Sequence, residues 1–174
     1  VGSPQFLSMR ELESLPPWPE ELVPALGSMA RIVVGNRQII CARAQFGLQC
    51  ESVSGSVAVR GILVRCEPWL GDSNEGCFAG EGLRGKVALI GRGGCRFTDK
   101  AERAQKAGAV AVVIVNNADV LFNVLGQATN IRVPVVSVTK SDANTLEDGV
   151  VASIIWGLHP TSVRRMSGVA HQGY

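Results

Sequence analysis

The stretch GKVALIGRGGCRFTDKAERAQKAGAVAVVIVNN, residues 85–117, decides the fold. It begins with KVALI (86–90), a short apolar run typical of a buried strand. A cluster of glycines around one cysteine follows, and then FTDKAERAQKAG (97–108), which predicts a helix. AVAVVIV (109–115) is apolar at every position, as expected of a strand that is buried on both faces. A strand, a helix and a second strand in this order predict parallel pairing of the two strands.

The helix predicted over residues 97–108 has two faces. We expect Thr98 to be its N-cap and Gly108 to end it, because these residue types favour those positions. Alanines that recur every three residues predict a face that lies close on a sheet: Ala101, Ala104 and Ala107. The basic residues of the helix lie away from that face, and we expect them to be solvated: Lys100, Arg103 and Lys106.

The remaining sequence predicts further strands on both sides of this unit. Apolar runs on either side of Gly35 and Asn36 indicate a hairpin within residues 30–47. The other predicted elements, in chain order, are a strand pair or one bulged strand (56–68), a loop (71–85), a strand (133–138), a short helix (141–149) and a closing strand (150–156). Together they predict an α/β domain with β/β/α layers, in which a mixed sheet carries short helices on one side.

Length and composition are those of one folded domain. The chain has 174 residues, of which 46% are hydrophobic, so it can bury a sizeable core. We expect a leader over residues 1–28, whose first residues resemble vector sequence, a folded domain over 29–158, and a C-terminal tail over 159–174. The formal net charge is only +2, so we expect no nucleic-acid partner. No apolar run approaches the roughly 20 residues that span a bilayer, so we expect no direct membrane insertion of this chain.

Five cysteines bear on the cellular compartment: Cys41, Cys50, Cys66, Cys77 and Cys95. None of them belongs to a CxxC pair and the sequence has no HExxH motif, so we expect no metal and no cofactor. Five cysteines can form two disulfides and leave one free thiol, an arrangement that indicates a secreted or lumenal chain. Five reduced thiols in a cytosolic chain are the alternative.

The glycine-rich loop is the first candidate for a nucleotide site or a catalytic centre. A dinucleotide motif GxGxxG that starts at Gly91 would need glycine where the chain has Arg96, and no Walker motif is present. Cys95 lies near a helix N-terminus but lacks a histidine partner, because His159 and His171 both lie beyond the last predicted strand. The sequence therefore predicts neither nucleotide binding nor a cysteine nucleophile.

Two weaker patterns also fail as chemical sites. Ser137 and Lys140 match SxxK, but the supporting KTG and SDN motifs are missing and Ser137 falls in a predicted strand. Asp72, Asn74 and Gly76 resemble a calcium loop, but the glycine comes one position too early, which favours a plain acidic turn. We expect no catalytic residues in this chain.

Residues 92–117, RGGCRFTDKAERAQKAGAVAVVIVNN, resemble the signature of the protease-associated (PA) domain family: R-G-x-C-x-F, a helix with A-x-x-A-Q-x-A-G-A, a buried strand and N-N. Three further segments resemble parts of the same family in the same order: ARAQFG (42–47), LVRCEPWLGDSNEGC (63–77) and VPVVSVTKSDANTL (133–146). The resemblance covers about residues 30–157.

The resemblance implies a non-catalytic module with a β/β/α fold that faces a lumen or the outside of the cell. Members of the family occur beside or inside subtilisin-like proteases, zinc exopeptidases, vacuolar sorting receptors and ER mannosidase-like proteins. We therefore expect the domain to bind a protein or peptide ligand or to modulate a neighbouring catalytic domain, in a parent protein that carries a protease, glycosidase or transmembrane region. The alternatives are a part of a larger protease or glycosidase whose active site lies outside this chain, and a ligand-free spacer or dimerisation domain.

The resemblance also implies site residues, because in sorting receptors the R-G-x-C loop contributes to peptide capture. The matching positions here are Arg92, Gly93 and Gly94. Asn116 and Asn117 would lie beside that loop if the strands before them are parallel neighbours, because both strands then end at the same edge. The alternative is that Arg92 forms a salt bridge with Glu81.

A disulfide between Cys77 and Cys95 is implied as well, since Cys77 occupies the position of the family cysteine that precedes the R-G-x-C loop. Such a bond would tie this loop to the long loop over residues 71–85. For the other cysteines two pairings stay open: Cys41 with Cys66 across neighbouring strands, or Cys41 with Cys50 nearby.

Overall fold

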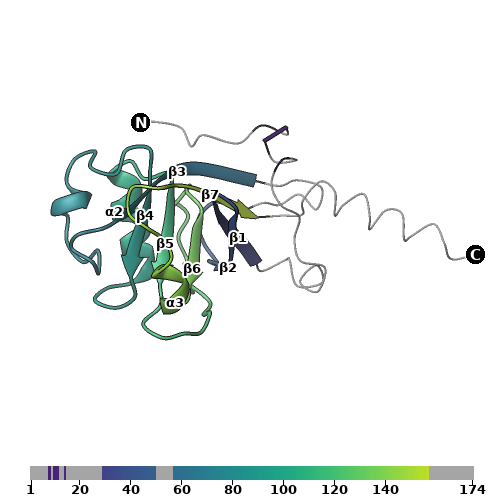
Figure 1. Ribbon diagram of the computed structural model, residues 1–174. Coiled ribbons are helices and arrows are strands. Elements are labelled where there is room, and N and C mark those ends of the chain that lie inside the picture. The colour runs from purple at the N-terminus through teal and green to yellow at the C-terminus, as the bar shows by residue number, and fades with distance from the viewer. Residues whose placement is uncertain (1–7, 9, 12–13, 15–28, 50–56, 157–174) are drawn as a thin grey trace, which may run out of the picture.

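A computed structural model describes residues 8, 10–11, 14, 29–49 and 57–156 of the chain. Within these residues, seven strands form one closed barrel in the order β1-β2-β6-β5-β4-β3-β7 (Figure 1). The elements are β1 Met29–Val34, β2 Arg37–Arg43, β3 Val57–Arg65, the 3-10 helix η2 Gly76–Phe78, β4 Lys86–Gly91, α2 Phe97–Lys106, β5 Ala111–Val115, β6 Val135–Val138, α3 Lys140–Ala143 and β7 Val151–Trp156. The mixed sheet with few short helices agrees with the predicted α/β class, but the strands close into one barrel rather than two β layers.

One half of the barrel is parallel and the other half is antiparallel. β3, β4, β5 and β6 are parallel neighbours. The pairing of β4 with β5 is the one that the strand–helix–strand order of residues 85–117 predicts. β1 and β2 form the predicted hairpin, with Gly35 at φ +56° in its turn, a conformation that glycine adopts without strain. β1 also pairs antiparallel with β7, β2 with β6, and β3 with β7, and these pairings close the barrel.

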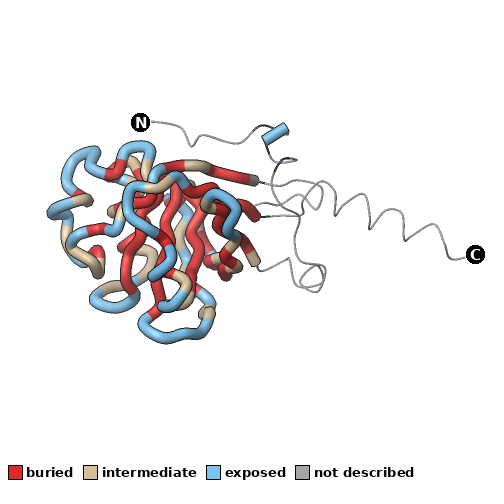
Figure 2. Tube along the Cα trace, viewed as in Figure 1, coloured by how far each residue is buried: buried red, intermediate tan, exposed pale blue. Residues whose placement is uncertain are grey.

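Each central parallel strand contributes to two cores, which explains why these strands are apolar at every position. In β4, Val87 and Leu89 belong to the core that all seven strands share, whereas Ala88 and Ile90 belong to a second core beneath α2. The alanine face of α2 completes the second core, as predicted, and its members are fully buried: Ala101, Ala104 and Ala107. Figure 2 shows the strands as mostly buried and the exposed residues concentrated in the connecting loops.

Helices α2 and α3 differ from the predicted helices at three of their four ends: the start of α2 and both ends of α3. α2 begins at Phe97 with Arg96 as its N-cap, and no side chain caps it, so the prediction of Thr98 as N-cap is wrong. The C-terminal end of α2 is as predicted, because Gly108 follows it with φ +92°. α3 is shorter than the helix predicted over residues 141–149.

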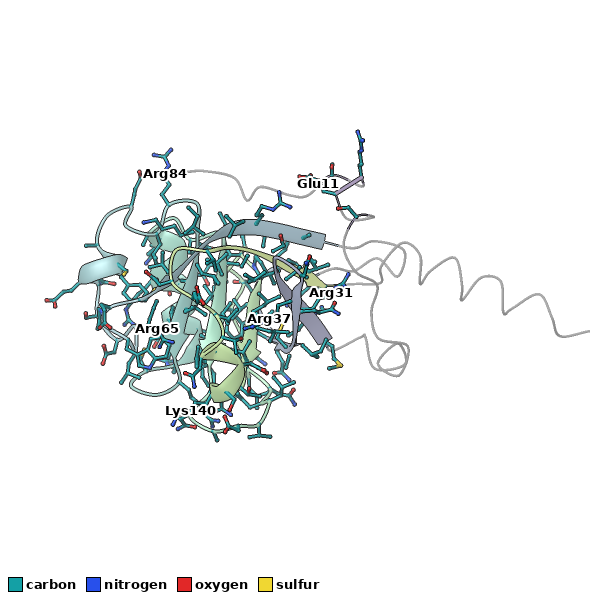
Figure 3. All side chains as sticks on the ribbon, viewed as in Figure 1. Glu11, Arg31, Arg37, Arg65, Arg84 and Lys140 are labelled. Carbon is teal, nitrogen blue, oxygen red and sulfur yellow. The ribbon has the colours of Figure 1, made fainter. Side chains whose placement is uncertain are left out.

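The predicted leader and tail lie almost entirely outside the described residues, and the domain boundaries stay predictions. One leader residue, Glu11, pairs with Arg60 of β3 at 3.3 Å; Glu11 is labelled in Figure 3. Hydrogen bonds from Ser8 lower the pKa of Glu11. Among the described residues, no helix has the length and apolar composition needed to cross a membrane.

Candidate ligand-binding site

The parallel half of the barrel brings the ends of three strands together at one edge. β4, β5 and β6 are in register, with Gly91 opposite Val115 and Val115 opposite Val138. The residues that follow these strands therefore lie side by side. Arg92 and Asn116 are in direct contact there, because the Arg92 Nη1 donates a hydrogen bond to the Asn116 Oδ1 at 3.1 Å.

We call this region the carboxyl edge, and it comprises residues 92–96, 116–122 and 139–141. Lys140 marks it near the bottom of Figure 3, and Arg84, which precedes β4, marks the opposite end of the sheet near the top. Arg84 pairs at that opposite end with Glu81 at 2.9 Å. The alternative in which Arg92 pairs with Glu81 is therefore wrong, because the two residues lie at opposite ends of β4.

The Arg92 side chain is exposed but held in place. Its guanidinium carbon lies 4.7 Å from the centroid of the Phe122 ring, a cation–π geometry, in addition to the hydrogen bond to Asn116. Phe122 in turn packs against Phe97 at the start of α2, with 5.6 Å between ring centroids. The bond to Asn116 and the aromatic contact fix one face and one nitrogen of the guanidinium, and within the described residues its other N–H groups have no hydrogen-bond acceptor.

Asn116 and Asn117 have different roles in the structure. Asn116 is buried, and its side chain accepts a hydrogen bond from the Asn117 backbone N–H at 2.9 Å and donates one to the Val120 carbonyl at 2.7 Å. Asn117 is exposed. Nearby, hydrogen bonds from Ser141 lower the pKa of Asp119 and occupy its carboxylate. Asn116 is thus a support for Arg92 and for the turn after β5, whereas Asn117 is accessible.

The loop between β4 and α2, residues 92–96, which we call the glycine loop, exposes backbone N–H groups beside Arg92. Gly93 and Gly94 have φ of +116° and +79°, conformations that favour glycine, and both are exposed. Within the described part of the chain, no group accepts a hydrogen bond from the N–H of either glycine. α2 begins immediately afterwards without a side-chain cap, so its first N–H groups add to a positive potential at the same place. Such a cluster of N–H groups favours carboxylates and peptide carbonyl groups.

Lys100 supports the glycine loop from below, and the prediction that it is solvated is wrong. It is fully buried, and its ammonium donates hydrogen bonds to the carbonyl groups of Leu70 and Gly93. Burial lowers the pKa of Lys100, while the neighbouring Cys95 and Asp72 oppose that effect. The spacing Phe97–Lys100–Ala104 does place Lys100 on the inner side of α2, and this signal could have shown its position.

Residues 66–77, which we call the buttress loop, lie against the glycine loop. The Trp69 carbonyl accepts a hydrogen bond from the Gly91 N–H at 2.8 Å, and a Cβ at Gly91 would lie 2.3 Å from the Trp69 Nε1. Arg65, labelled in Figure 3, covers the Trp69 ring at 4.6 Å. Arg103 donates a hydrogen bond to the Gly71 carbonyl at 2.9 Å, so this basic residue is not freely solvated either. The buttress loop was missed in the sequence, where residues 71–85 indicate only a loop.

Four cysteines of the described residues carry free thiols: Cys41, Cys66, Cys77 and Cys95. The implied disulfide between Cys77 and Cys95 is therefore not formed in the structure. The Cys77 sulfur accepts a hydrogen bond from the Glu67 N–H at 3.4 Å, whereas the Cys95 sulfur lies 3.3 Å from the Arg103 Nη1. The two side chains thus have different partners.

The other suggested pairings involve Cys41. Cys41 is fully buried in the barrel core, where burial raises the pKa of its thiol, and it is not bonded to Cys66. Cys50 lies outside the described residues, so its pairing with Cys41 stays a prediction.

The other patterns that the sequence analysis considered as chemical sites have structural roles or no counterpart in the described residues. Ser137 is buried in β6, and its hydroxyl donates a hydrogen bond to the Phe122 carbonyl at 2.7 Å. The described residues hold no group of three or more His, Cys, Asp or Glu side chains placed to bind a metal ion.

Comparisons with known proteins agree with this architecture. The family model of the PA domain matches residues 40–146. The zinc aminopeptidase BSAP from Bacillus subtilis shares the fold, with a TM-score of 0.60 and 23% identity over 86% of this chain and 35% of that one.

Similar sequences come from longer proteins. The chain is 27% identical over 154 residues to the ER degradation-enhancing alpha-mannosidase-like protein 3 of Xenopus laevis, covering 82% of this chain and 16% of that protein. It is 41% identical over 76 residues to the probable lipoprotein aminopeptidase LpqL of Mycobacterium tuberculosis, covering 40% of this chain and 15% of that protein. The chain thus spans about a sixth of the length of these relatives. Because the family model matches more than half of its residues, the chain belongs to the PA domain family.

Proposed function

We propose that this PA domain is a non-catalytic module that binds an extended protein or peptide segment at the carboxyl edge. The observation that carries the proposal is the cluster of free hydrogen-bond donors there: the backbone N–H groups of Gly93 and Gly94, the uncapped start of α2, and the exposed Arg92 guanidinium. All of these groups donate, so the edge suits a ligand that presents acceptors, such as a side-chain or C-terminal carboxylate followed by peptide carbonyl groups.

Apolar surface next to these donors supports a peptide ligand rather than a small anion. Val120 is 59% exposed and Leu125 is 56% exposed, in the segment that follows Asn116. Phe122, between them in the sequence, is half-buried beneath Arg92. A peptide whose carboxylate reaches Arg92 can place an apolar side chain on this segment, which adds contact area. Because Arg92 is already held by Asn116 and Phe122, little side-chain entropy is lost on binding.

The compartment we propose is the secretory-pathway lumen or the extracellular space. Relatives of this chain are described as an extracellular protease of Bacillus subtilis and as an ER degradation-enhancing protein. A donor-rich peptide site in such a compartment suits capture of a client or of another segment of the parent protein.

A second function is favoured by the similarity of this chain to short parts of longer peptidases. The similar proteins named as peptidases are several times longer than this chain, since it covers 15% of the lipoprotein aminopeptidase and 10% of the Bacillus extracellular protease. In that arrangement the domain would modulate a neighbouring catalytic domain, with the active site outside this chain. The carboxyl edge would then bind a segment of the parent protein instead of a separate client.

Replacing Arg92 by alanine is expected to weaken peptide binding about tenfold or more, as loss of a charge-assisted hydrogen bond of roughly 1.5–3 kcal/mol implies. The probe is a peptide selected from a displayed random library on the immobilised wild-type chain, and its affinity is measured by fluorescence anisotropy. Arg84→Ala is the matched control, because Arg84 is equally an exposed arginine but lies at the opposite end of β4.

The same assay distinguishes the alternatives. Unchanged affinity in both Arg92→Ala and Asn117→Ala would show that recognition lies elsewhere on the domain. A library that yields no binder to the wild-type chain would favour a ligand-free spacer. Selected peptides that match the parent protein's own sequence would favour modulation of a neighbouring domain.

A further inference from the structure

The base of the buttress loop brings two cysteines together. The backbone N–H of Cys77 donates to the Glu67 carbonyl at 2.9 Å, and the Glu67 N–H donates back to the Cys77 sulfur at 3.4 Å. The first bond joins the two ends of the loop, and the second places the Cys77 sulfur against the Cys66–Glu67 peptide group. Burial, and after it the neighbouring Cys77 side chain, raise the pKa of the Cys66 thiol. The two ends of the loop, Cys66 and Cys77, are thus held next to each other, with the Cys77 sulfur against the peptide group that follows Cys66.

The close approach is built into the backbone by a glycine. Gly76 has φ +56°, and a Cβ at this position would lie 2.1 Å from the Glu67 carbonyl oxygen. Any other residue would push the two ends of the buttress loop apart. The thiols also differ in access, because Cys66 is fully buried while Cys77 is partly exposed. A solvent-borne reactant therefore reaches the Cys77 sulfur first.

We infer that Cys66 and Cys77 form a disulfide in an oxidising compartment and that this bond closes the buttress loop at its base. The oxidant is a small-molecule or protein disulfide, R–S–S–R. The Cys77 thiolate attacks one of its sulfurs and releases the first RS⁻, which leaves Cys77–S–S–R. Cys66 then loses its proton and attacks the Cys77 sulfur, which releases the second thiol. Two electrons and two protons pass to R–S–S–R, and the products are one intramolecular disulfide and two R–SH.

The bond stabilises the part of the molecule on which the glycine loop rests. Between its two ends, the buttress loop offers the Trp69 carbonyl to Gly91 and the Leu70 carbonyl to Lys100, which also holds Gly93. Closing the loop covalently removes conformations from the unfolded chain and limits opening of the folded one. This pairing stands apart from the proposed peptide binding, since it depends only on the geometry of residues 66–77.

Peptide mapping tests the pairing on the full chain after exposure to oxidised glutathione. Free thiols are alkylated under denaturing conditions and the protein is digested with trypsin. Cys66 and Cys77 fall in one tryptic peptide, residues 66–84, whereas Cys95 falls in another, residues 93–96. We expect peptide 66–84 without alkylation and lighter by two hydrogen atoms than its reduced form. A glutamate-specific protease, which cleaves after Glu75 and Glu81, should then release residues 82–84 but leave residues 66–75 and 76–81 joined.

Two other results would overturn the inference. A cross-link between peptides 66–84 and 93–96 would show that Cys95 is the partner instead. Full alkylation of both Cys66 and Cys77 after oxidation would show that the pair does not form. The Cys95→Ser variant is the matched control and should keep the closed peptide 66–84. As a second readout, the oxidised chain should melt about 5–10 °C higher than the reduced one and exchange the amide hydrogens of residues 66–77 more slowly.

Discussion

Replacing Gly76 by alanine is expected to lower the free energy of unfolding by about 3 kcal/mol, through two additive causes. The first is the left-handed backbone, φ +56°, which costs a residue with a Cβ about 1 kcal/mol. The second is the contact of the new Cβ with the Glu67 carbonyl oxygen at 2.1 Å. That oxygen accepts the Cys77 N–H bond, so relieving the contact stretches or breaks it, at a further cost of about 2 kcal/mol.

Gly80→Ala separates these two causes. Gly80 has nearly the same backbone conformation, φ +54°, but a Cβ there would meet no atom within 4 Å. This variant should therefore lose only about 1 kcal/mol. Urea denaturation of the reduced chain, in which no disulfide can form, measures both changes at constant m value. Equal losses in the two variants would show that the approach of Gly76 to Glu67 does not constrain the buttress loop.

Most secondary structure could be predicted because it depends on local patterns. The parallel strands are short apolar runs, and the Gly35 turn and the Gly108 helix end use conformations that glycine favours. For residues 56–68 the sequence leaves open a strand pair or one bulged strand, and the structure has the single strand β3, which contains Gly61. Glycine is needed there for a packing reason: a Cβ would lie 2.8 Å from the Gly85 carbonyl oxygen and 2.9 Å from the Val110 side chain. That reason involves the residues just before β4 and β5, which are distant from Gly61 in the sequence.

Closure of the barrel could not be predicted, because no local pattern specifies it. It depends on pairing of β3 with β7 and of β2 with β6, in which Gly61 meets Ala152 and Ala42 meets Ser137. These partners are about ninety residues apart in the sequence, and their side chains suit several neighbours equally well. Two stacked layers and one closed barrel use the same strands with the same apolar faces, so composition does not distinguish them.

The candidate site was partly predictable for the same reason. The parallel order of β4 and β5 predicts that Arg92 and Asn116 lie at one edge, and they are hydrogen-bonded there. The burial of Asn116 was not predictable, since it depends on the path of residues 117–120. The buttress loop was also missed, because its contacts with Gly91 and Lys100 are made by backbone carbonyl groups. Every residue type has such a group, so the sequence does not indicate these contacts.

Lys100→Met is the second variant with a large expected effect, a loss of about 2–3 kcal/mol in the free energy of unfolding. Methionine fills nearly the same volume but leaves the carbonyl groups of Leu70 and Gly93 without their buried donor. Loss of hydrogen bonds from a charged donor costs about 1.5–3 kcal/mol, and the Gly93 carbonyl keeps one partner, the Cys95 N–H. Burial of the ammonium destabilises the wild-type protein, as the lowered pKa of Lys100 indicates. Methionine removes this buried charge, which offsets part of the loss.

Lys106→Met is the matched control for Lys100→Met. Lys106 lies on the same helix but is exposed, and it pairs only with Glu102 one turn away at 3.0 Å, so its replacement should change stability by no more than about 0.5 kcal/mol. Chemical denaturation gives the stability of both variants. Hydrogen exchange at the Gly91 and Cys95 amides, which are hydrogen-bonded to the Trp69 and Gly93 carbonyl groups, should accelerate only in Lys100→Met. Equal stability of the two variants would mean that desolvation of the buried ammonium cancels its two hydrogen bonds. Faster exchange at the glycine loop without a loss of global stability would instead assign Lys100 to positioning the loop alone.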